Sequence, residues 1–192
     1  MDHKSKNRGA STLQDARMVR SRAALREALL SLLETTGYDK ITVRDITARA
    51  PTGYATFFRH YDTKAALLHD VAANQIGQLI QQALPILLSV DSRGAARALC
   101  RYVDERRKLW SALLFGGAAG IMREEFIRQV RQIPPLESSS SQWLPNDLKI
   151  IYGVCSTVEI LAWWLQKPAG FSVDHVAEIL DRLVIAPMMA PD

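Results

Sequence analysis

The chain has 192 residues, 48% of them hydrophobic and 23% charged, and a formal net charge of +4. This length and composition are those of a soluble globular protein with one or two compact domains. The first residues are polar and basic, and no stretch approaches the roughly 20 apolar residues of a membrane span, so we expect neither a secretory signal nor membrane contact, and a cytoplasmic location.

The excess positive charge lies in the N-terminal third of the chain. Residues 1–70 contain 12 Lys and Arg against 8 Asp and Glu, whereas residues 71–192 contain 12 of each kind. Residues 1–16 have no apolar pattern and predict a disordered basic arm. A basic arm beside a neutral body indicates a polyanionic partner, although a merely solvated tail would have the same composition.

Helical periodicity follows this arm. The first helix is predicted from four core leucines at helix spacing, with a glycine as its stop: Leu25, Leu29, Leu32, Leu33 and Gly37. A capping box from Thr42 to Asp45 opens a second helix. That helix must end near Ala50, because Pro51 disfavours helical backbone in the residue before it.

A short third helix is predicted over residues 53–60, and Asp62 or Thr63 can cap a long fourth helix that runs to about Leu84. Further helical segments are expected near 92–103, 104–116, 118–132, 146–167 and 172–188. The Pro-Pro and Ser-rich stretch 133–141 interrupts them as a loop. No convincing alternating run is present, so the predicted fold class is all-α.

Two short helices joined by a tight turn are the outline of a helix-turn-helix, whose second helix enters the major groove of DNA. Here the sequence resembles the TetR family of bacterial transcriptional regulators. The resemblance covers residues 18–70. It is carried by Gly37-Tyr38, Thr42-Val43-Arg44-Asp45-Ile46, Ala55-Thr56-Phe57-Phe58-Arg59-His60-Tyr61 and Lys64-Ala65-Ala66-Leu67-Leu68.

The resemblance implies a helix-turn-helix DNA-binding domain at residues 17–63 and a helical effector-binding and dimerisation domain at 64–192. It implies a regulator, typically a repressor, that a small-molecule effector releases from a palindromic double-stranded DNA operator. Ile46 and Phe57 should fill the centre of the first domain, and Tyr61 should close it against the fourth helix. We expect no enzymatic activity, no cofactor and no metal.

The residues expected to contact DNA are Arg44, Gly53, Tyr54, Ala55, Thr56, Phe58, Arg59, His60 and Lys64. Tyr54, Ala55 and Thr56 should face base edges, and Arg44 should bind a guanine or a phosphate. Arg59 and His60 should meet phosphates at the end of the helix. Lys64 lies in the first turn of the next helix, where backbone N–H groups and the dipole favour a phosphate. Simple solvation is the alternative for each of them.

Three positions depart from the family pattern. Pro51 stands where a glycine is usual, so Gly53 is expected to supply the permissive residue of the turn. Gly53 also replaces a serine cap, and Phe58 replaces a tyrosine whose hydroxyl often meets phosphate. We expect these departures to affect which operator sequence is bound and not to affect the fold.

The last two predicted helices are apolar over a wide arc, which indicates burial on two sides and a homodimer through these helices. A monomeric core pair is the alternative. The middle helices mix aromatic and small residues, which is compatible with a cavity for an apolar or aromatic effector or with ordinary core packing. The candidate effector residues are Tyr102, Trp110, Phe115, Met122, Phe126, Cys155 and Trp163.

The rival functions for this chain are an enzyme and a DNA-independent adaptor. An enzyme would need a recognisable site, but His3, His60, His69 and His175 have no metal-ligand spacing, and no nucleophile elbow or phosphate-cradling glycine motif is present. A DNA-independent adaptor would not need a basic arm beside a helix-turn-helix. The two cysteines share no motif and are expected to be small buried hydrophobes.

Overall fold

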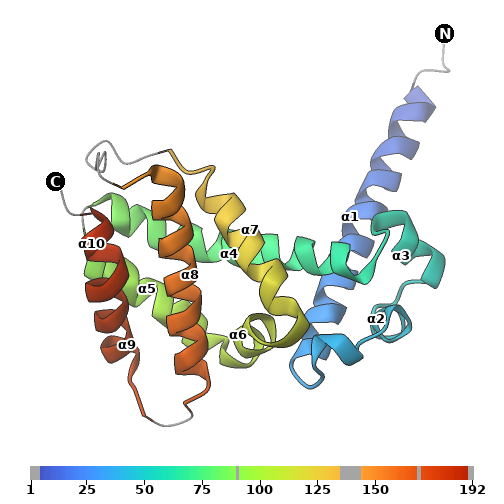
Figure 1. Ribbon diagram of the computed structural model, residues 1–192. Coiled ribbons are helices and arrows are strands. Elements are labelled where there is room, and N and C mark those ends of the chain that lie inside the picture. Colours follow the sequence, from blue (N-terminus) through green and yellow to red (C-terminus); the bar gives the residue numbers. More distant parts are fainter. Residues whose placement is uncertain (1–4, 90, 135–143, 168–169, 190–192) are drawn as a thin grey trace. The chain divides into compact units, whose positions relative to one another are not determined.

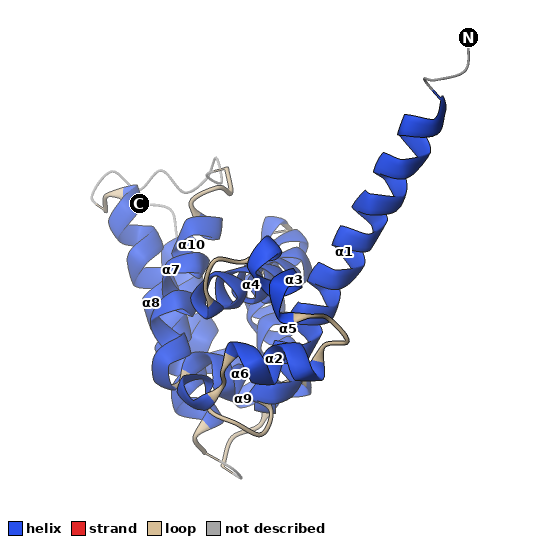
Figure 2. Ribbon diagram, turned by 90° about the vertical axis from the view of Figure 1, so that its right-hand side faces the viewer, coloured by secondary structure: helices blue, strands red, loops and turns tan. Residues whose placement is uncertain are grey.

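The computed structural model describes residues 5–89, 91–134, 144–167 and 170–189, with side chains from residue 15 onward. Every regular element in these ranges is helical, as Figure 2 shows, which confirms the all-α fold class. The chain divides into two compact units, residues 1–71 and 72–192. The division falls within one long helix, later than the boundary at residue 64 that the sequence suggested.

The first unit contains α1 (Ser5–Leu33), the 3₁₀ turn η1 (Tyr38–Lys40), α2 (Val43–Arg49), α3 (Tyr54–His60) and the start of α4 (Lys64–Leu88). We expected a disordered arm over residues 1–16, but α1 already begins at Ser5, and only residues 1–4 lie outside the described range. This segment contains no proline, so no residue in it forces the helix to start later.

The core of the first unit is close to the one expected. Leu25, Leu29, Ile46 and Phe57 are fully buried, and Tyr61 is 5% exposed. Leu32 is only half-buried, so three of the four leucines of α1 form the core stripe. These apolar side chains hold α1 against α2 and α3, and α2 against α3.

The expected helix caps are present. Thr42 accepts from the Asp45 N–H at 3.2 Å, and the Asp45 carboxylate accepts from the Thr42 N–H at 2.8 Å, which completes a capping box. Hydrogen bonds from Thr42 lower the pKa of Asp45. Thr63 caps α4, since its Oγ1 accepts from the Ala66 N–H.

The turn between α2 and α3 is built differently from the sequence expectation. Ala50 is extended, with φ −78° and ψ 134°, which is the conformation that the following Pro51 favours. Gly53 has φ −73° and ψ 156°, so it does not supply a left-handed residue. Proline at position 51 therefore fits the turn, and Gly53 acts as an N-cap without a side-chain hydrogen bond.

The second unit contains the rest of α4, then α5 (Ser92–Glu105), α6 (Arg107–Leu114), the 3₁₀ turn η2 (Gly116–Ala118) and α7 (Ala119–Val130). It continues with α8 (Asn146–Leu165), α9 (Val173–Leu180), the π-helical turn η4 (Asp181–Ile185) and α10 (Ala186–Met189). α9 packs on α5 and α8, and these helices lie side by side in Figure 1. Pro85 does not end α4, which continues to Leu88.

The structure explains why glycine stands at two positions of the second unit. Gly116 has φ 62°, a left-handed conformation that side chains disfavour, and it begins the turn η2 between α6 and α7. Gly153 lets Met188 approach the backbone of α8, because a Cβ at this position would lie 2.5 Å from Met188 Cε. The C-terminal segment can thereby pack closely on α8.

Helix α8 has the length and apolar composition of a membrane span, and it is the only such helix among the described residues. Core helices of globular proteins have the same properties. α8 packs against α6, α7 and α9, and its buried side chains include Val154, Val158, Leu161 and Trp164. This packing accounts for its apolar composition without a membrane.

Candidate functional site

The expected DNA-contacting residues of α2 and α3 separate into exposed and engaged side chains. Gly53 and five side chains, Arg44, Tyr54, Ala55, Phe58 and Arg59, are exposed; we call these five the α2–α3 surface. Thr56, His60 and Lys64 are half-buried. Since Phe57 on the opposite side of α3 is fully buried, α3 turns one side to the core and the other to solvent.

Two exposed aromatic rings stand on this surface. Tyr54 is 57% exposed and Phe58 is 44% exposed, and their ring centroids lie 5.1 Å apart in an edge-on arrangement. Phe58 also contacts Phe57, with a centroid distance of 5.2 Å. Large exposed apolar side chains on a monomeric surface mark interaction sites. The charges of Arg44 and Arg59 beside these rings favour an anionic partner.

Lys64 has a role that the sequence did not reveal. Its ammonium donates to the carbonyl oxygens of Tyr38 and Ile41 at 2.9 and 2.7 Å, and it lies 4.2 Å from the centroid of the Tyr38 ring. Lys64 therefore ties η1 and the residue after it to the start of α4. Two of the three N–H groups of this ammonium are thus used within the protein, and only the third is available for the expected phosphate contact.

His60 is likewise engaged inside the first unit. Its Nε2 lies 2.7 Å from Ser21 Oγ on α1. Burial, with the charges of Arg59 and Arg22, lowers the pKa of His60. A neutral ring that already contacts Ser21 is a poorer phosphate ligand than the sequence suggested.

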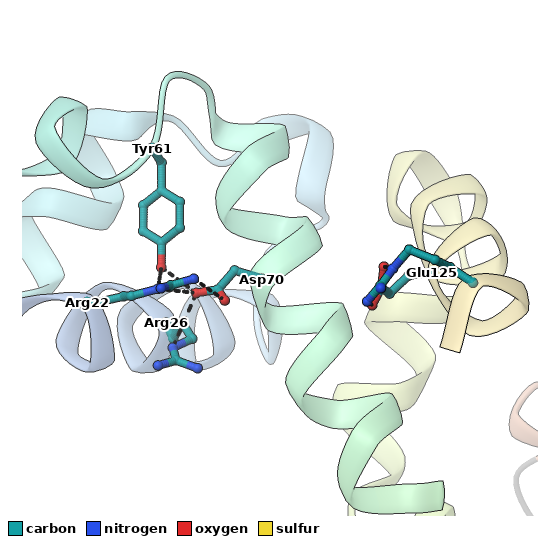
Figure 3. A network of polar contacts seen from close by, with 6 residues as sticks. Arg22, Arg26, Tyr61, Asp70 and Glu125 are labelled. Carbon is teal, nitrogen blue, oxygen red and sulfur yellow. Dashed lines mark hydrogen bonds and ion pairs between the residues drawn. The ribbon is translucent and has the colours of Figure 1, made fainter. Parts of the chain in front are cut away.

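A polar network connects α1 with α4 in this unit (Figure 3). Arg22 donates to both carboxylate oxygens of Asp70, at 2.8 and 3.1 Å, and Tyr61 donates to Asp70 Oδ2. Arg26 adds a longer contact of 3.4 Å to the same carboxylate. This network was not expected from the sequence. Its one sequence signal is the spacing of Arg22 and Arg26, which places both on one side of α1.

The second unit contains an apolar cavity of about 310 Å³. Its walls come from α4, α5, α7, α8, η4 and α10, and include Leu79, Ile80, Val154 and Met188. Lys149, which is 9% exposed, belongs to the lining. This volume is at the lower end of the range for small-molecule sites.

The cavity does not lie among the residues predicted for an effector. Of those seven, only Phe126 lines it. Tyr102, Trp110 and Met122 are 1% exposed and belong to the core, Phe115 and Cys155 are half-buried, and Trp163 is exposed. Tyr102 donates to Gln78 at 2.8 Å and meets Trp110 edge-on, so these aromatic side chains pack on protein groups instead of lining a space. Among the described residues no cluster of three metal-ligating side chains occurs.

Comparisons with known proteins agree with this two-part organisation. Residues 25–71 match the sequence model of the family described as bacterial regulatory proteins, tetR family. The chain is 39% identical over 168 residues to the HTH-type transcriptional regulator YxbF of Bacillus subtilis strain 168, and the match covers 84% of this chain. The chain spans 44% of the length of that curated relative.

Solved structures extend the likeness over both units. A TetR transcriptional regulator of Streptococcus agalactiae 2603V is similar with a TM-score of 0.66 and 22% identity, over 91% of this chain and 99% of that one. The fatty acid degradation regulator FadR of Bacillus halodurans has a TM-score of 0.63 and 12% identity, over 86% and 94%. FadR of Thermus thermophilus, solved with lauroyl-CoA, has a TM-score of 0.57 and 15% identity, over 89% and 96%. At these identities the likeness concerns the fold.

Proposed function

We propose that this chain is a bacterial helix-turn-helix transcriptional regulator of the TetR type, which binds an operator as a homodimer and is released from it by a small-molecule effector. Repression of transcription is the proposed consequence of binding. The protein acts in the cytoplasm, without a cofactor, a metal or enzymatic activity of its own. The first unit binds DNA, and the second pairs the protomers and binds the effector.

The observation that carries the DNA-binding proposal is the α2–α3 surface. It combines two exposed aromatic rings with the charges of Arg44 and Arg59 on the helix pair that matches the family model. Tyr54 and Ala55 lie in the first turn of α3, the part of a recognition helix that reaches base edges. In this proposal Arg44 on α2 binds a guanine or a phosphate, and Arg59 at the end of α3 binds a phosphate.

The homodimer proposal depends on apolar side chains that the protomer leaves exposed. Leu148, Tyr152 and Trp163 on α8 are 51%, 50% and 38% exposed, and Leu183 in η4 is 59% exposed. Together these side chains favour association of a second copy of the chain. Leu161 on the same helix is 1% exposed and belongs to the core of the protomer.

The effector proposal depends on the cavity of the second unit. A partly enclosed, mostly apolar space is the usual form of a small-molecule site. The lauroyl-CoA in the Thermus thermophilus relative is a precedent for a small-molecule ligand in this fold. The effector must bind the DNA-free state better than the DNA-bound state in order to release the operator.

The experiment that tests the proposed function is a gel shift of the full chain on the DNA upstream of its own gene. We expect a complex that survives excess random DNA, and a footprint with inverted-repeat symmetry whose half-sites lie about 34–36 Å apart. Equal affinity for upstream and random DNA would contradict a specific operator. A screen for turnover of candidate substrates tests the rival function, an enzyme, and we expect no turnover.

A further inference from the structure

The N-terminal half of α1 projects beyond α2 and α3 in the first unit, as Figures 1 and 2 both show. Among the described side chains of α1, the first polar contacts with other elements are those of Ser21 with His60 and of Arg22 with Asp70. Each residue from 15 to 20 is exposed. A helix rises 1.5 Å per residue, so residues 5–20 form a projection of about 24 Å.

The projecting half has no apolar stripe for a protein partner. At 3.6 residues per turn, the positions of its apolar residues spread over nearly the whole circumference of the helix. A helix that packs on another protein segment, a second copy of this chain included, repeats such residues along one side. The apolar residues of the projection are Ala10, Leu13, Ala16, Met18 and Val19.

The charge of the projection is positive. In the described part of the chain Arg17 has no carboxylate partner, and Arg20 donates to the Ala16 carbonyl of its own helix. Exposed cations without carboxylate partners, on a helix without an apolar stripe, favour a polyanion. Residues 5–20 contain four basic residues, Lys6, Arg8, Arg17 and Arg20, against the one acidic residue Asp15.

The projection begins beside the end of α3. Ser21 Oγ lies 2.7 Å from Nε2 of His60, the last residue of α3. Arg17 precedes Ser21 by four residues, so it lies on the same side of α1, about 6 Å further along the helix axis. Arg59 of the α2–α3 surface directly precedes His60 and is exposed. The row of cations on α1 therefore starts close to the place where we expect Arg59 to bind a phosphate.

We propose that residues 5–20 of α1 are a second DNA-binding element, which binds the phosphate backbone next to the groove that receives α3. This inference rests on the proposed DNA-binding function and adds to it. The α2–α3 surface would read the sequence, and α1 would add affinity for DNA of any sequence. An α-helix with its side chains is about 10–12 Å wide and the minor groove is about 6 Å wide, so α1 lies on the phosphates and not in that groove.

Salt titrations of the full chain on the DNA upstream of its gene and on random DNA test this contact. Arg17→Gln should reduce the slope of log affinity against log salt by about one per half-site, and Arg17→Gln with Arg20→Gln by about two. The affinities for the two DNAs should fall by the same factor, because phosphates are common to every sequence. The control, Arg93→Gln with Arg101→Gln, removes the same charge from exposed positions of α5 and should leave the slope unchanged.

Ethylation interference locates the contact, since ethylation removes the charge of one phosphate at a time. Interference at some phosphates should be present with the native chain and absent with the Arg17→Gln/Arg20→Gln variant. Lys6→Gln with Arg8→Gln should abolish interference at phosphates further from α3, because these residues lie about 14–16 Å beyond Arg17 along the helix. Circular dichroism melts verify that each variant is folded, and the Lys6→Gln/Arg8→Gln variant decides if the arginine pair does not fold.

The inference is overturned if the folded α1 variants keep the native salt slope, if the α5 control lowers the slope equally, or if the loss falls on the upstream DNA alone. Failure of the proposed function has a different signature. If the native chain binds both DNAs equally and the α1 variants reduce the slope, the contact of α1 stands and the specific operator fails. If the native chain prefers the upstream DNA and the slope does not change, the operator stands and this inference fails.

Discussion

The guanidinium of Arg22 in α1 makes a two-point contact with the carboxylate of Asp70 in α4, through Nη2–Oδ1 at 2.8 Å and Nε–Oδ2 at 3.1 Å. Tyr61, in the loop before α4, donates to the same carboxylate. Burial alone would raise the pKa of Asp70, but the hydrogen bonds from Arg22 and Tyr61 and the charge of Arg26 outweigh it and lower the pKa. Asp70 thus joins α1, the α3–α4 loop and α4 through one partly buried charge.

Replacing this charge by a neutral amide should destabilise the first unit. Asp70→Asn keeps the shape but gives Arg22 a weaker acceptor, so we expect unfolding free energy to fall by about 1–3 kcal/mol. Urea denaturation followed by circular dichroism measures the loss. Asp62→Asn, at an exposed position in the same loop region, is the matched control and should change stability little. If both variants had the same unfolding free energy, the network around Asp70 would not stabilise the first unit.

The same network predicts a pH dependence. The pKa of Asp70 is lower in the folded protein than its ordinary value of about 3.9 in an unfolded chain. Its stabilisation is therefore fully present above the unfolded value and is lost as the pH falls through the folded value. Asp70→Asn should lose stability at neutral pH and approach the native protein in acid. A difference between the two that stays constant down to acid pH would contradict this assignment.

Lys64 should stabilise the protein more than it contributes to DNA affinity. Lys64→Met keeps the apolar stem but removes the side-chain donor to the Ile41 carbonyl and one of the two donors to the Tyr38 carbonyl, which keeps the Ile41 N–H, so we expect a loss of about 1–3 kcal/mol in unfolding free energy. The slope of DNA affinity against salt should remain that of the native protein. If the salt slope of the variant were instead smaller by about one per half-site, Lys64 would contact a phosphate, as the sequence suggested.

Local features of the first unit could be predicted because they depend on neighbours in sequence. The capping box of Thr42 and Asp45, the Thr63 cap and the core stripe of Leu25 and Leu29 each follow from spacing within one helix. The contacts of Lys64 with Tyr38 and of Arg22 with Asp70 join segments far apart in the chain. Residue types at such distances do not specify which partners meet, so these contacts needed the structure.

The second unit illustrates a different limit of sequence reasoning. Aromatic residues between glycines suggested a cavity, but large rings also fill space well, and Tyr102 and Trp110 are buried in contact with each other. The actual cavity lies where α4, α8 and α10 meet, among aliphatic side chains that look like ordinary core in the sequence. A void is a property of three-dimensional packing, and helical periodicity carries no information about it.

Trp110 should therefore act as a core residue. It is 1% exposed and lies outside the cavity lining. Trp110→Ala should cost about 3–5 kcal/mol of unfolding free energy through the space it leaves, and Trp110→Phe should cost less. Denaturation of both variants beside a ligand titration checks this. A stable Trp110→Ala variant with an altered effector response would return this residue to the effector site.

The dimer should depend on exposed side chains of α8 rather than on Leu161. Tyr152→Glu places a charge on a residue that is 50% exposed, so it should break the dimer without unfolding the protomer. Leu161→Glu should instead unfold the protein, because Leu161 is 1% exposed. Sedimentation velocity at micromolar concentration separates the two outcomes. Leu88→Glu, 55% exposed on α4, is the control that should remain dimeric.

Operator specificity should reside in Arg44 and Tyr54, which are exposed on the α2–α3 surface. Arg44→Ala and Tyr54→Ala should each weaken operator binding by about 1–3 kcal/mol per half-site and affect random DNA much less. Arg59→Ala should weaken both DNAs alike and reduce the salt slope by about one per half-site, because Arg59 stands at the end of α3, where phosphates are the nearer target. Salt titrations on operator and random DNA measure both effects.

Arg93→Ala is the matched control for this series, since Arg93 is an exposed arginine on α5 in the second unit. It should change neither the operator affinity nor the salt slope. If Tyr54→Ala and Arg44→Ala reduced the affinity for random DNA as much as that for the operator, these residues would contact the backbone and sequence reading would lie elsewhere. If Arg59→Ala acted on the operator alone, Arg59 would read bases, because a phosphate contact lowers the affinity for every sequence by the same factor.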